Sequence, residues 1–93
     1  MQEYKGMFII RPDQTEDQIK AIIEDVKKGF TEHNGEITSV DEWGMRQLAY
    51  EIDDLKKGYY VLFIANADSE AIEEFNRIAN IHEDIMRHII VRN

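Results

Sequence analysis

The chain has 93 residues, no cysteine and a formal net charge of -8 at pH 7, which arises from 19 acidic residues against 11 lysines and arginines. This length fits a single domain, residues 1–93, and a chain without cysteine has neither disulfides nor thiolate metal sites, as is typical of a reducing cytoplasm. The first residues lack the layout of a signal peptide, and the longest apolar run (59–65) is far below the roughly 20 residues that span a bilayer, so we expect a soluble cytoplasmic protein.

The chain begins with a predicted strand and a predicted helix. Residues 4–10 are apolar, and Pro12 ends this strand because proline cannot donate to a ladder. A capping box between Thr15 and Gln18 then indicates a helix over 15–33. Its apolar residues recur at helical spacing and predict one buried face, made of Ile19, Ile22, Ile23, Val26 and Phe30.

A long strand follows. Asn34 and Gly35 favour a left-handed end to the helix, and the residues after them predict a strand over 36–52. Gly44 interrupts this strand, and an isolated strand glycine predicts a β-bulge or a close approach of another backbone. The polar stretch 53–58 is predicted to be a loop.

The second half repeats the order of the first. Residues 59–65 predict a strand, and Asp68 and Ser69 mark the start of a helix over 68–80. The buried face of this helix is predicted from its apolar positions, Ile72, Phe75, Ile78 and Ala79. The β-rich residues 85–91 predict the last strand.

The order of these elements predicts a fold of the α+β class. Strand–helix–strand followed by strand–helix–strand is typical of the ferredoxin-like split βαβ arrangement. Right-handed crossovers place both helices on one face of a four-stranded antiparallel sheet, with the first and third strands in the centre. The other face of the sheet then has no helix on it, and we expect that face to bind a partner.

Several sequence features resemble the bacterial small-subunit ribosomal protein S6 family. The most specific is a stretch of the long strand, Gly44-x-Arg46-x-Leu48-Ala49-Tyr50-x-Ile52. Tyr4, Gly58-Tyr59 and Arg87 match as well, and the features extend over almost the whole chain. The resemblance implies a structural component of the small ribosomal subunit, not an enzyme. Such a component would bind the central domain of small-subunit ribosomal RNA together with ribosomal protein S18.

The net charge bears on both expected partners. A charge of -8 argues against nucleic-acid binding by the chain alone, because phosphate contacts depend on lysine and arginine. The resemblance implies that ribosomal protein S18 is strongly basic, and an acidic chain suits such a companion electrostatically. The two ends of the chain are its least acidic parts: residues 1–12 carry two cations against one carboxylate, and 85–93 carry two arginines unopposed. Side by side in a sheet, they would form a basic strip.

The candidate site residues fall into two groups. The candidates for RNA contact are polar residues of the resembling stretch, the hairpin and the last strand: Arg46, Gln47, Lys56, Arg87 and Arg92. The candidates for the protein interface are mainly aromatic: Tyr4, Trp43, Leu48, Tyr50 and Tyr59. Core packing with the hydroxyl at the rim is an equal alternative for the tyrosines, and packing at the base of the long hairpin is the favoured one for Trp43. A solvated edge charge is the alternative for Arg46.

The sequence offers little for catalysis or for a cofactor. His33, His82 and His88 do not have the spacing of a zinc site, and there is no glycine-rich phosphate loop, so we expect no metal and no cofactor. One alternative function is a free-standing RNA-recognition module, whose third strand would begin Lys57-Gly58-Tyr59 but which would lack an aromatic at Val61. Another is a small ligand-sensing domain of the same fold.

Overall fold

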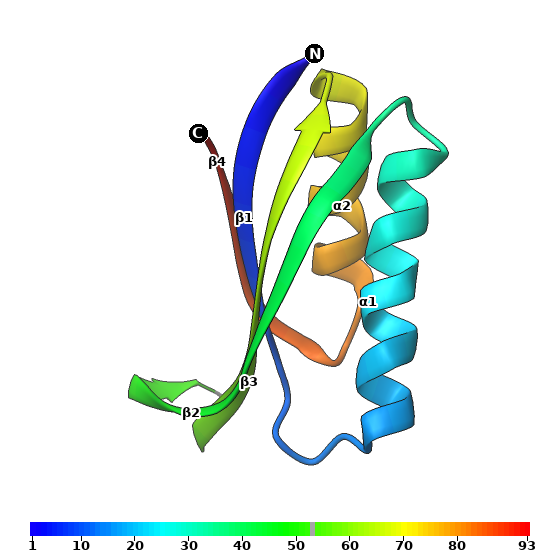
Figure 1. The fold of residues 1–93 in the computed structure, drawn as a ribbon. Helices are drawn as coiled ribbons and strands as arrows, with labels where there is room; N and C mark the ends of the chain where they lie inside the picture. The colour runs from blue at the N-terminus through cyan, green and yellow to red at the C-terminus, as the bar shows by residue number, and fades with distance from the viewer. Residues whose placement is uncertain (53) are drawn as a thin grey trace.

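A computed structural model describes residues 1–52 and 54–93 of the chain. The six elements follow the predicted order, and they are β1 (Gln2–Ile10), α1 (Glu16–Thr31), β2 (Glu36–Ile52), β3 (Leu55–Ala67), α2 (Ser69–Ile81) and β4 (Ile85–Arg92). Both helices lie on the same face of the sheet (Figure 1). The predicted ferredoxin-like split βαβ fold is therefore confirmed. Neither helix in the described residues has the length and apolar character needed to cross a bilayer.

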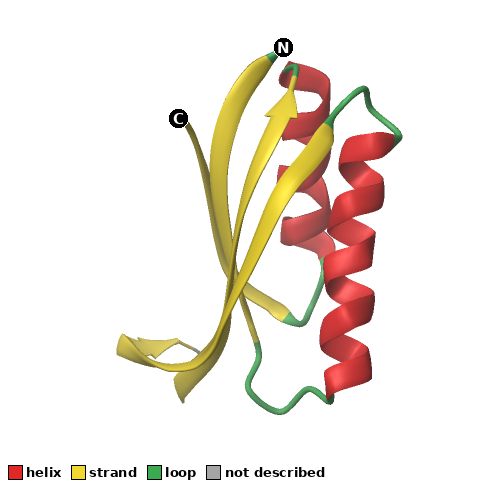
Figure 2. Ribbon diagram, viewed as in Figure 1, coloured by secondary structure: helices red, strands yellow, loops and turns green. Residues whose placement is uncertain are grey.

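The four strands form one antiparallel sheet with the order β2-β3-β1-β4. The first and third strands are central, as predicted, and β2 and β4 are the edges. Figure 2 shows two layers, a twisted sheet and a pair of helices, with the second face of the sheet free of helices. Because β1 pairs with β4, the two least acidic segments of the chain lie side by side, which is the arrangement that a basic strip requires.

The core lies between the sheet and the helices. Its centre is a group of phenylalanines whose ring centroids lie 5.2–6.4 Å apart, contributed by β1, α1, β3 and α2 in turn: Phe8, Phe30, Phe63 and Phe75. Gly6 of β1 lies opposite Phe63 of this group, and a Cβ atom added to Gly6 would come within 2.2 Å of the Phe63 ring. The glycine therefore makes room for the largest side chains of the core.

Helix α1 begins and ends as its sequence predicts, with a small shift at the end. The hydroxyl of Thr15 accepts a hydrogen bond from the Gln18 backbone N–H (3.2 Å), and the Thr15 N–H donates to the Gln18 side chain (2.8 Å), which completes the capping box. The five apolar residues of its predicted face are all buried. The helix stops at Thr31, and Asn34 takes the left-handed conformation (φ 59°).

The predicted loop over 53–58 is wrong for most of its length. Strand β3 starts at Leu55, and the ladder with β2 extends through Gln47 opposite Lys57. We call the end of the β2–β3 hairpin beyond Gly44 (residues 45–52 and 54–58) the distal hairpin. Its residues 53–58 looked like a loop because most of the described side chains there are exposed, and the strand carries lysines where a core strand would carry apolar residues. Asp53 lies outside the described residues, and Asp54 has a positive φ of 64°.

Gly44 marks a bend in β2. The register of β2 against β3 shifts between Glu42 and Gly44, and Gly44 has a φ of 80°, so the predicted β-bulge is confirmed. An added Cβ would meet nothing within 4 Å, which rules out the alternative of a close backbone approach. Beyond this point the β2–β3 hairpin curves away from the helices, toward the free side of the sheet (Figure 1).

Candidate protein and nucleic-acid interface

The face of the sheet that no helix covers is largely apolar. In this register Met7 lies between Leu62 and Ile89, on the opposite side of the strands from Phe8. We call this surface the open face, and its side chains are Lys5, Met7, Ile9, Tyr60, Leu62, Ile64, Arg87, Ile89 and Val91. Ile89 is 54% exposed and Val91 50%. Surfaces of this kind on a folded domain mark places where another molecule packs.

The distal hairpin covers one end of the open face. The side chains of Ile9 and Leu48 both lie next to Gly58 of β3. A Cβ atom added to Gly58 would stand 2.3 Å from the Ile9 side chain and 3.6 Å from the Leu48 side chain. Glycine is required here because any side chain would collide with Ile9. Leu48 and Ile9 therefore meet above the strand, and Ile9 is only 4% exposed although no helix lies over it.

Two arginine–aromatic pairs flank this covered end. The guanidinium carbon of Arg87 lies 5.2 Å from the centroid of the Tyr50 ring, which links the hairpin to edge strand β4. The guanidinium carbon of Arg46 lies 5.7 Å from the centroid of the Trp43 ring. Such cation–π contacts stabilise by about 0.5–1 kcal/mol at exposed sites. Both arginines are thereby held over aromatic rings while they remain exposed to solvent.

Trp43 has a polar anchor of its own. Its Nε1–H donates to the Asp41 carboxylate (2.9 Å), and the residue is 48% exposed, so Trp43 is only partly packed against the hairpin. Beside it lies a hollow of about 220 Å³, which also involves Lys5, Ser39 and Leu62. The hollow is large enough for one apolar side chain of a partner.

The structure brings together some predicted site residues and separates others. Arg46, Trp43, Leu48, Tyr50 and Arg87 lie on the side of the open face. Tyr4 and Tyr59 face the helix layer instead, opposite Ala65 and Ile10, and pack against the core. Arg92 lies opposite Tyr4 and so shares its face. Gln47 and Lys56 are exposed in the distal hairpin.

Burial and hydrogen bonding both act on Tyr59. Its hydroxyl donates to the Glu42 carboxylate (2.9 Å). Burial raises the pKa of Tyr59 above the ordinary 10.0, and the bond to Glu42 raises this pKa further because it favours the neutral phenol. Tyr59 therefore stays protonated and ties β3 to β2 across the edge of the sheet.

Sequence reasoning missed the apolar part of the open face. Met7, Leu62, Ile64, Ile89 and Val91 were not among the candidates. A signal for them exists, because β1 and β4 contain apolar residues at consecutive positions, as in 7–10 and 89–91. A strand that is apolar on both faces is typical of burial on both sides. In this fold, helices supply only one of those sides.

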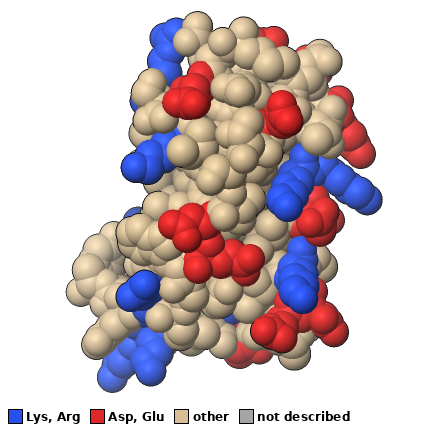
Figure 3. Space-filling view, viewed as in Figure 1, with Lys and Arg blue, Asp and Glu red and all other residues tan. Residues whose placement is uncertain are grey.

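Charge is unevenly distributed over the surface. Figure 3 shows lysine and arginine side chains gathered at the distal hairpin, at the lower left, which contains Arg46, Lys56 and Lys57. In the same view acidic side chains lie over the middle of the molecule, and on the helix side, at the right, they alternate with further lysine and arginine side chains. In the part of the chain that the structure describes, no three His, Asp or Glu side chains are placed to hold a metal ion. The arrangement is suited to recognition, through apolar contact and cationic groups.

Comparison with known proteins agrees with this geometry. The profile of the ribosomal protein S6 family matches residues 3–92. The crystal structure of 30S ribosomal protein S6 from Thermotoga maritima superimposes with a TM-score of 0.93 at 31% sequence identity, over 99% of this chain and 87% of that one. A protein from Arabidopsis thaliana superimposes with a TM-score of 0.59 at 11% identity, over 100% of this chain and 93% of that one, and shares only the fold.

Proposed function

Because the chain belongs to the ribosomal protein S6 family and is a structural, non-enzymatic component of the small ribosomal subunit, we propose that it binds the central domain of the small-subunit ribosomal RNA as a heterodimer with ribosomal protein S18. The observation that carries this proposal is the open face, where an apolar centre lies beside two arginine–aromatic pairs.

The apolar centre supports a protein partner. Ile89 and Val91 are half exposed beside Met7, and Trp43 borders a hollow that fits an apolar side chain. Burying these groups against a second protein would stabilise the complex by the hydrophobic effect. The net charge of -8 favours a basic partner such as ribosomal protein S18, by accelerating encounter and by selecting against acidic proteins.

The cationic groups beside this centre are suited to RNA. Arg46, Arg87 and Lys56 lie on or near the distal hairpin, and an arginine stacked on an aromatic ring still has donors for phosphate or a base edge. Gln47 can add a neutral hydrogen bond. Arg92, on the other face of edge strand β4, would reach RNA only at the end of the sheet. So few cations on a chain of net -8 give weak RNA affinity alone, and the basic partner supplies the rest.

Two of the aromatic candidates have a supporting role in this proposal. Tyr4 and Tyr59 pack on the helix side of the sheet, where they position the strands that carry the open face. Trp43, Leu48 and Tyr50 remain as candidates for direct contact with the partner.

The test is a titration of a central-domain ribosomal RNA fragment with this chain, with ribosomal protein S18, and with an equimolar mixture. We expect the mixture to bind at least about tenfold more tightly than either protein alone, a gain of about 1.4 kcal/mol. Equal affinity of the lone chain and the mixture at physiological salt would contradict the proposal. Ribosomal protein S18 that binds fully without this chain would contradict it as well.

A further inference from the structure

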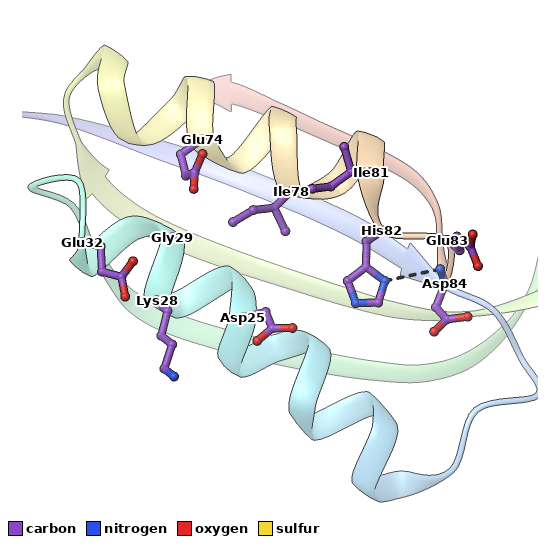
Figure 4. Close-up of a pocket in the computed structure, with 10 residues that line it drawn as sticks. All are labelled: Asp25, Lys28, Gly29, Glu32, Glu74, Ile78, Ile81, His82, Glu83 and Asp84. Carbon is purple, nitrogen blue, oxygen red and sulfur yellow. Dashed lines mark hydrogen bonds between the residues drawn. The ribbon is translucent and has the colours of Figure 1, made fainter.

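A second hollow lies on the helix side of the molecule, between α1 and α2 (Figure 4), and we call it the helix groove. Its volume is about 540 Å³. The floor is apolar and consists of Gly29 from α1 and Ile78 and Ile81 from α2. The helices approach closely at Gly29, where an added Cβ would come within 2.5 Å of the Ile78 side chain. Ile81, in the last turn of α2, is 65% exposed.

The sides of the helix groove are acidic. Asp25 and Glu32 lie along α1, Glu74 lies on α2, and Glu83 and Asp84 follow in the turn after α2. Lys28 is the one lysine or arginine among the residues that line the groove in the described structure. The close-up in Figure 4 shows these carboxylates spaced along the groove, from Glu32 and Glu74 at the left to the turn with Glu83 and Asp84 at the right.

Few of these carboxylates are neutralised. Glu74 pairs with Arg77, whose Nη2 donates to it at 2.7 Å, and this hydrogen bond holds the pKa of Glu74 below its usual range. Asp84 accepts a hydrogen bond from the neutral side chain of Gln14. Among the residues that the structure describes, Asp25, Glu32 and Glu83 have no ion pair.

We propose that the helix groove binds a lysine- or arginine-rich segment of another protein, with an apolar side chain of that segment packed on Ile81 and its cations paired with the groove carboxylates. Ribosomal RNA is a polyanion, so this surface repels it and favours a protein. The carboxylates are spread along the groove, and no three converge on one point in the described residues, so they match a chain of positive charges better than a single metal ion. The apolar floor favours a peptide over a purely ionic ligand.

The helix groove and the open face lie on opposite sides of the sheet, so both can be occupied at once (Figures 1 and 4). The proposal therefore goes beyond binding of ribosomal RNA and ribosomal protein S18. It gives the acidic side of the molecule a partner of its own, a basic protein segment within the same assembly.

The test is a titration of the isotope-labelled full chain with a short synthetic peptide of repeated Lys-Lys-Leu, followed by amide chemical shifts. We expect saturable shifts at Gly29, Ile81 and Glu83, and none at Met7 or Ile89. A Lys-Lys-Ser peptide has the same charge without the apolar side chain, and we expect it to bind several-fold more weakly. A Glu-Glu-Leu peptide should not bind.

Charge-reversed variants test the role of the carboxylates. Glu32→Lys combined with Glu83→Lys is expected to weaken binding of the Lys-Lys-Leu peptide roughly tenfold, since acidic residues at an interface select a cationic partner. The matched control is Glu73→Lys, an exposed glutamate of α2 that does not line the groove, combined with Glu24→Lys on α1. The control should bind within about twofold of the parent chain.

The apolar contact has its own pair of variants. Ile81→Ser is expected to remove the advantage of Lys-Lys-Leu over Lys-Lys-Ser. Ile89→Ser changes another exposed isoleucine, on the open face, and should leave that advantage intact. Both residues are surface exposed, so neither change should unfold the chain.

Three results would overturn the proposal: shifts spread evenly over all acidic surface residues, equal binding of spermidine and the Lys-Lys-Leu peptide, or shifts centred on the open face. The outcome is separable from the proposed function. If Ile89→Ser abolishes the RNA complex but leaves peptide binding unchanged, the result concerns the proposed function of the open face and not the helix groove.

Discussion

Arg46 is the residue whose charge matters most for the proposed RNA contact. It lies in the distal hairpin with its guanidinium over Trp43, and nothing in the described structure neutralises it. Arg46→Glu is expected to weaken binding of the central-domain RNA by the mixture with ribosomal protein S18 about tenfold, because one attractive phosphate contact becomes a repulsive one. Copurification of the variant with small subunits should fall accordingly.

The matched control is Lys20→Glu on α1, which makes the same change of charge on an exposed residue far from the open face. If both variants weaken RNA binding equally, the effect comes from net charge and not from the position of Arg46. Circular dichroism of both variants should match the parent chain, because both side chains are exposed.

Tyr59 offers a test at a single hydroxyl. Its pKa is raised chiefly by burial and then by the hydrogen bond to Glu42, so Glu42→Gln is expected to lower the pKa of Tyr59 only part of the way to 10.0. Because the neutral phenol is favoured in the folded state, its stabilising contribution is fully present below about pH 10 and is lost as the pH rises through the folded-state pKa. Tyrosine-resolved NMR from pH 8 to 12 measures this.

Glu16 provides the comparison for Tyr59. Its charge also raises the pKa of Tyr59, but it is the smallest contribution and involves no hydrogen bond. Glu16→Gln should therefore lower this pKa less than Glu42→Gln does. An equal or larger change would mean that long-range charge, and not the hydrogen bond, governs the hydroxyl.

At the scale of elements, the two helices differ in how they begin. Thr15 caps α1 with a full capping box, whereas the Asp68 side chain makes no capping hydrogen bond to α2. Thr15→Ala is expected to lower the free energy of unfolding by about 1 kcal/mol. Asp68→Ala should cost less, since the exposed pair of Asp68 with the amino terminus contributes little. Urea unfolding measures the free energy of unfolding of both variants. Equal losses would contradict the conclusion that Thr15 caps its helix and Asp68 does not.

The elements themselves could be read from the sequence because each has its own periodic signal. Thr15 and Gln18 fixed the start of α1, and apolar spacing identified its buried face. The distal hairpin could not be read in this way. Lys56 and Lys57 belong to the distal end of β3, outside the part of that strand that alternates between buried and half-buried residues, so the side-chain pattern at this end carries no hydrophobic period.

The candidate site could be predicted only in part, for a related reason. The stretch around Arg46 identified one end of the site. Tyr4 and Tyr59, however, lie on the other face of the sheet, because the pairing register decides which side chains of a strand face the core, and the sequence of one strand does not reveal that register. The helix groove depends on two helices far apart in sequence. No local pattern marks residues that meet only when Gly29 and Ile78 pack together.

At the scale of the whole molecule, net charge is the dominant electrostatic feature. The chain carries -8 within a body of 37 × 24 × 21 Å, and its described residues contain four ion pairs, each with at least one exposed partner. At about 0.01 M salt the Debye length of about 30 Å spans most of this body, whereas at 0.15 M it is about 8 Å. Self-repulsion is therefore strong at low salt and screened at physiological salt.

The free energy of unfolding at pH 7 is expected to rise when sodium chloride is increased between these two concentrations. Urea midpoints at each concentration measure the effect, and potassium chloride should give the same result if screening is the cause. A fall in stability with salt would mean that attractive surface pairs outweigh repulsion. The Glu73→Lys variant, which reduces the net negative charge, should show a smaller salt effect.

The central position of β1 has a consequence for the order of events during synthesis. Both of its neighbours, β3 and β4, come later in the chain, and β4 ends at Arg92. Of the four strands, β1 is therefore made first and is the last to have both of its ladders complete. Contacts this distant in sequence close slowly, and domains tend to fold as units during translation. The open face therefore lacks Arg87, Ile89 and Val91 until β4 has been made and has paired with β1, and a partner that contacts these side chains can bind only after that step.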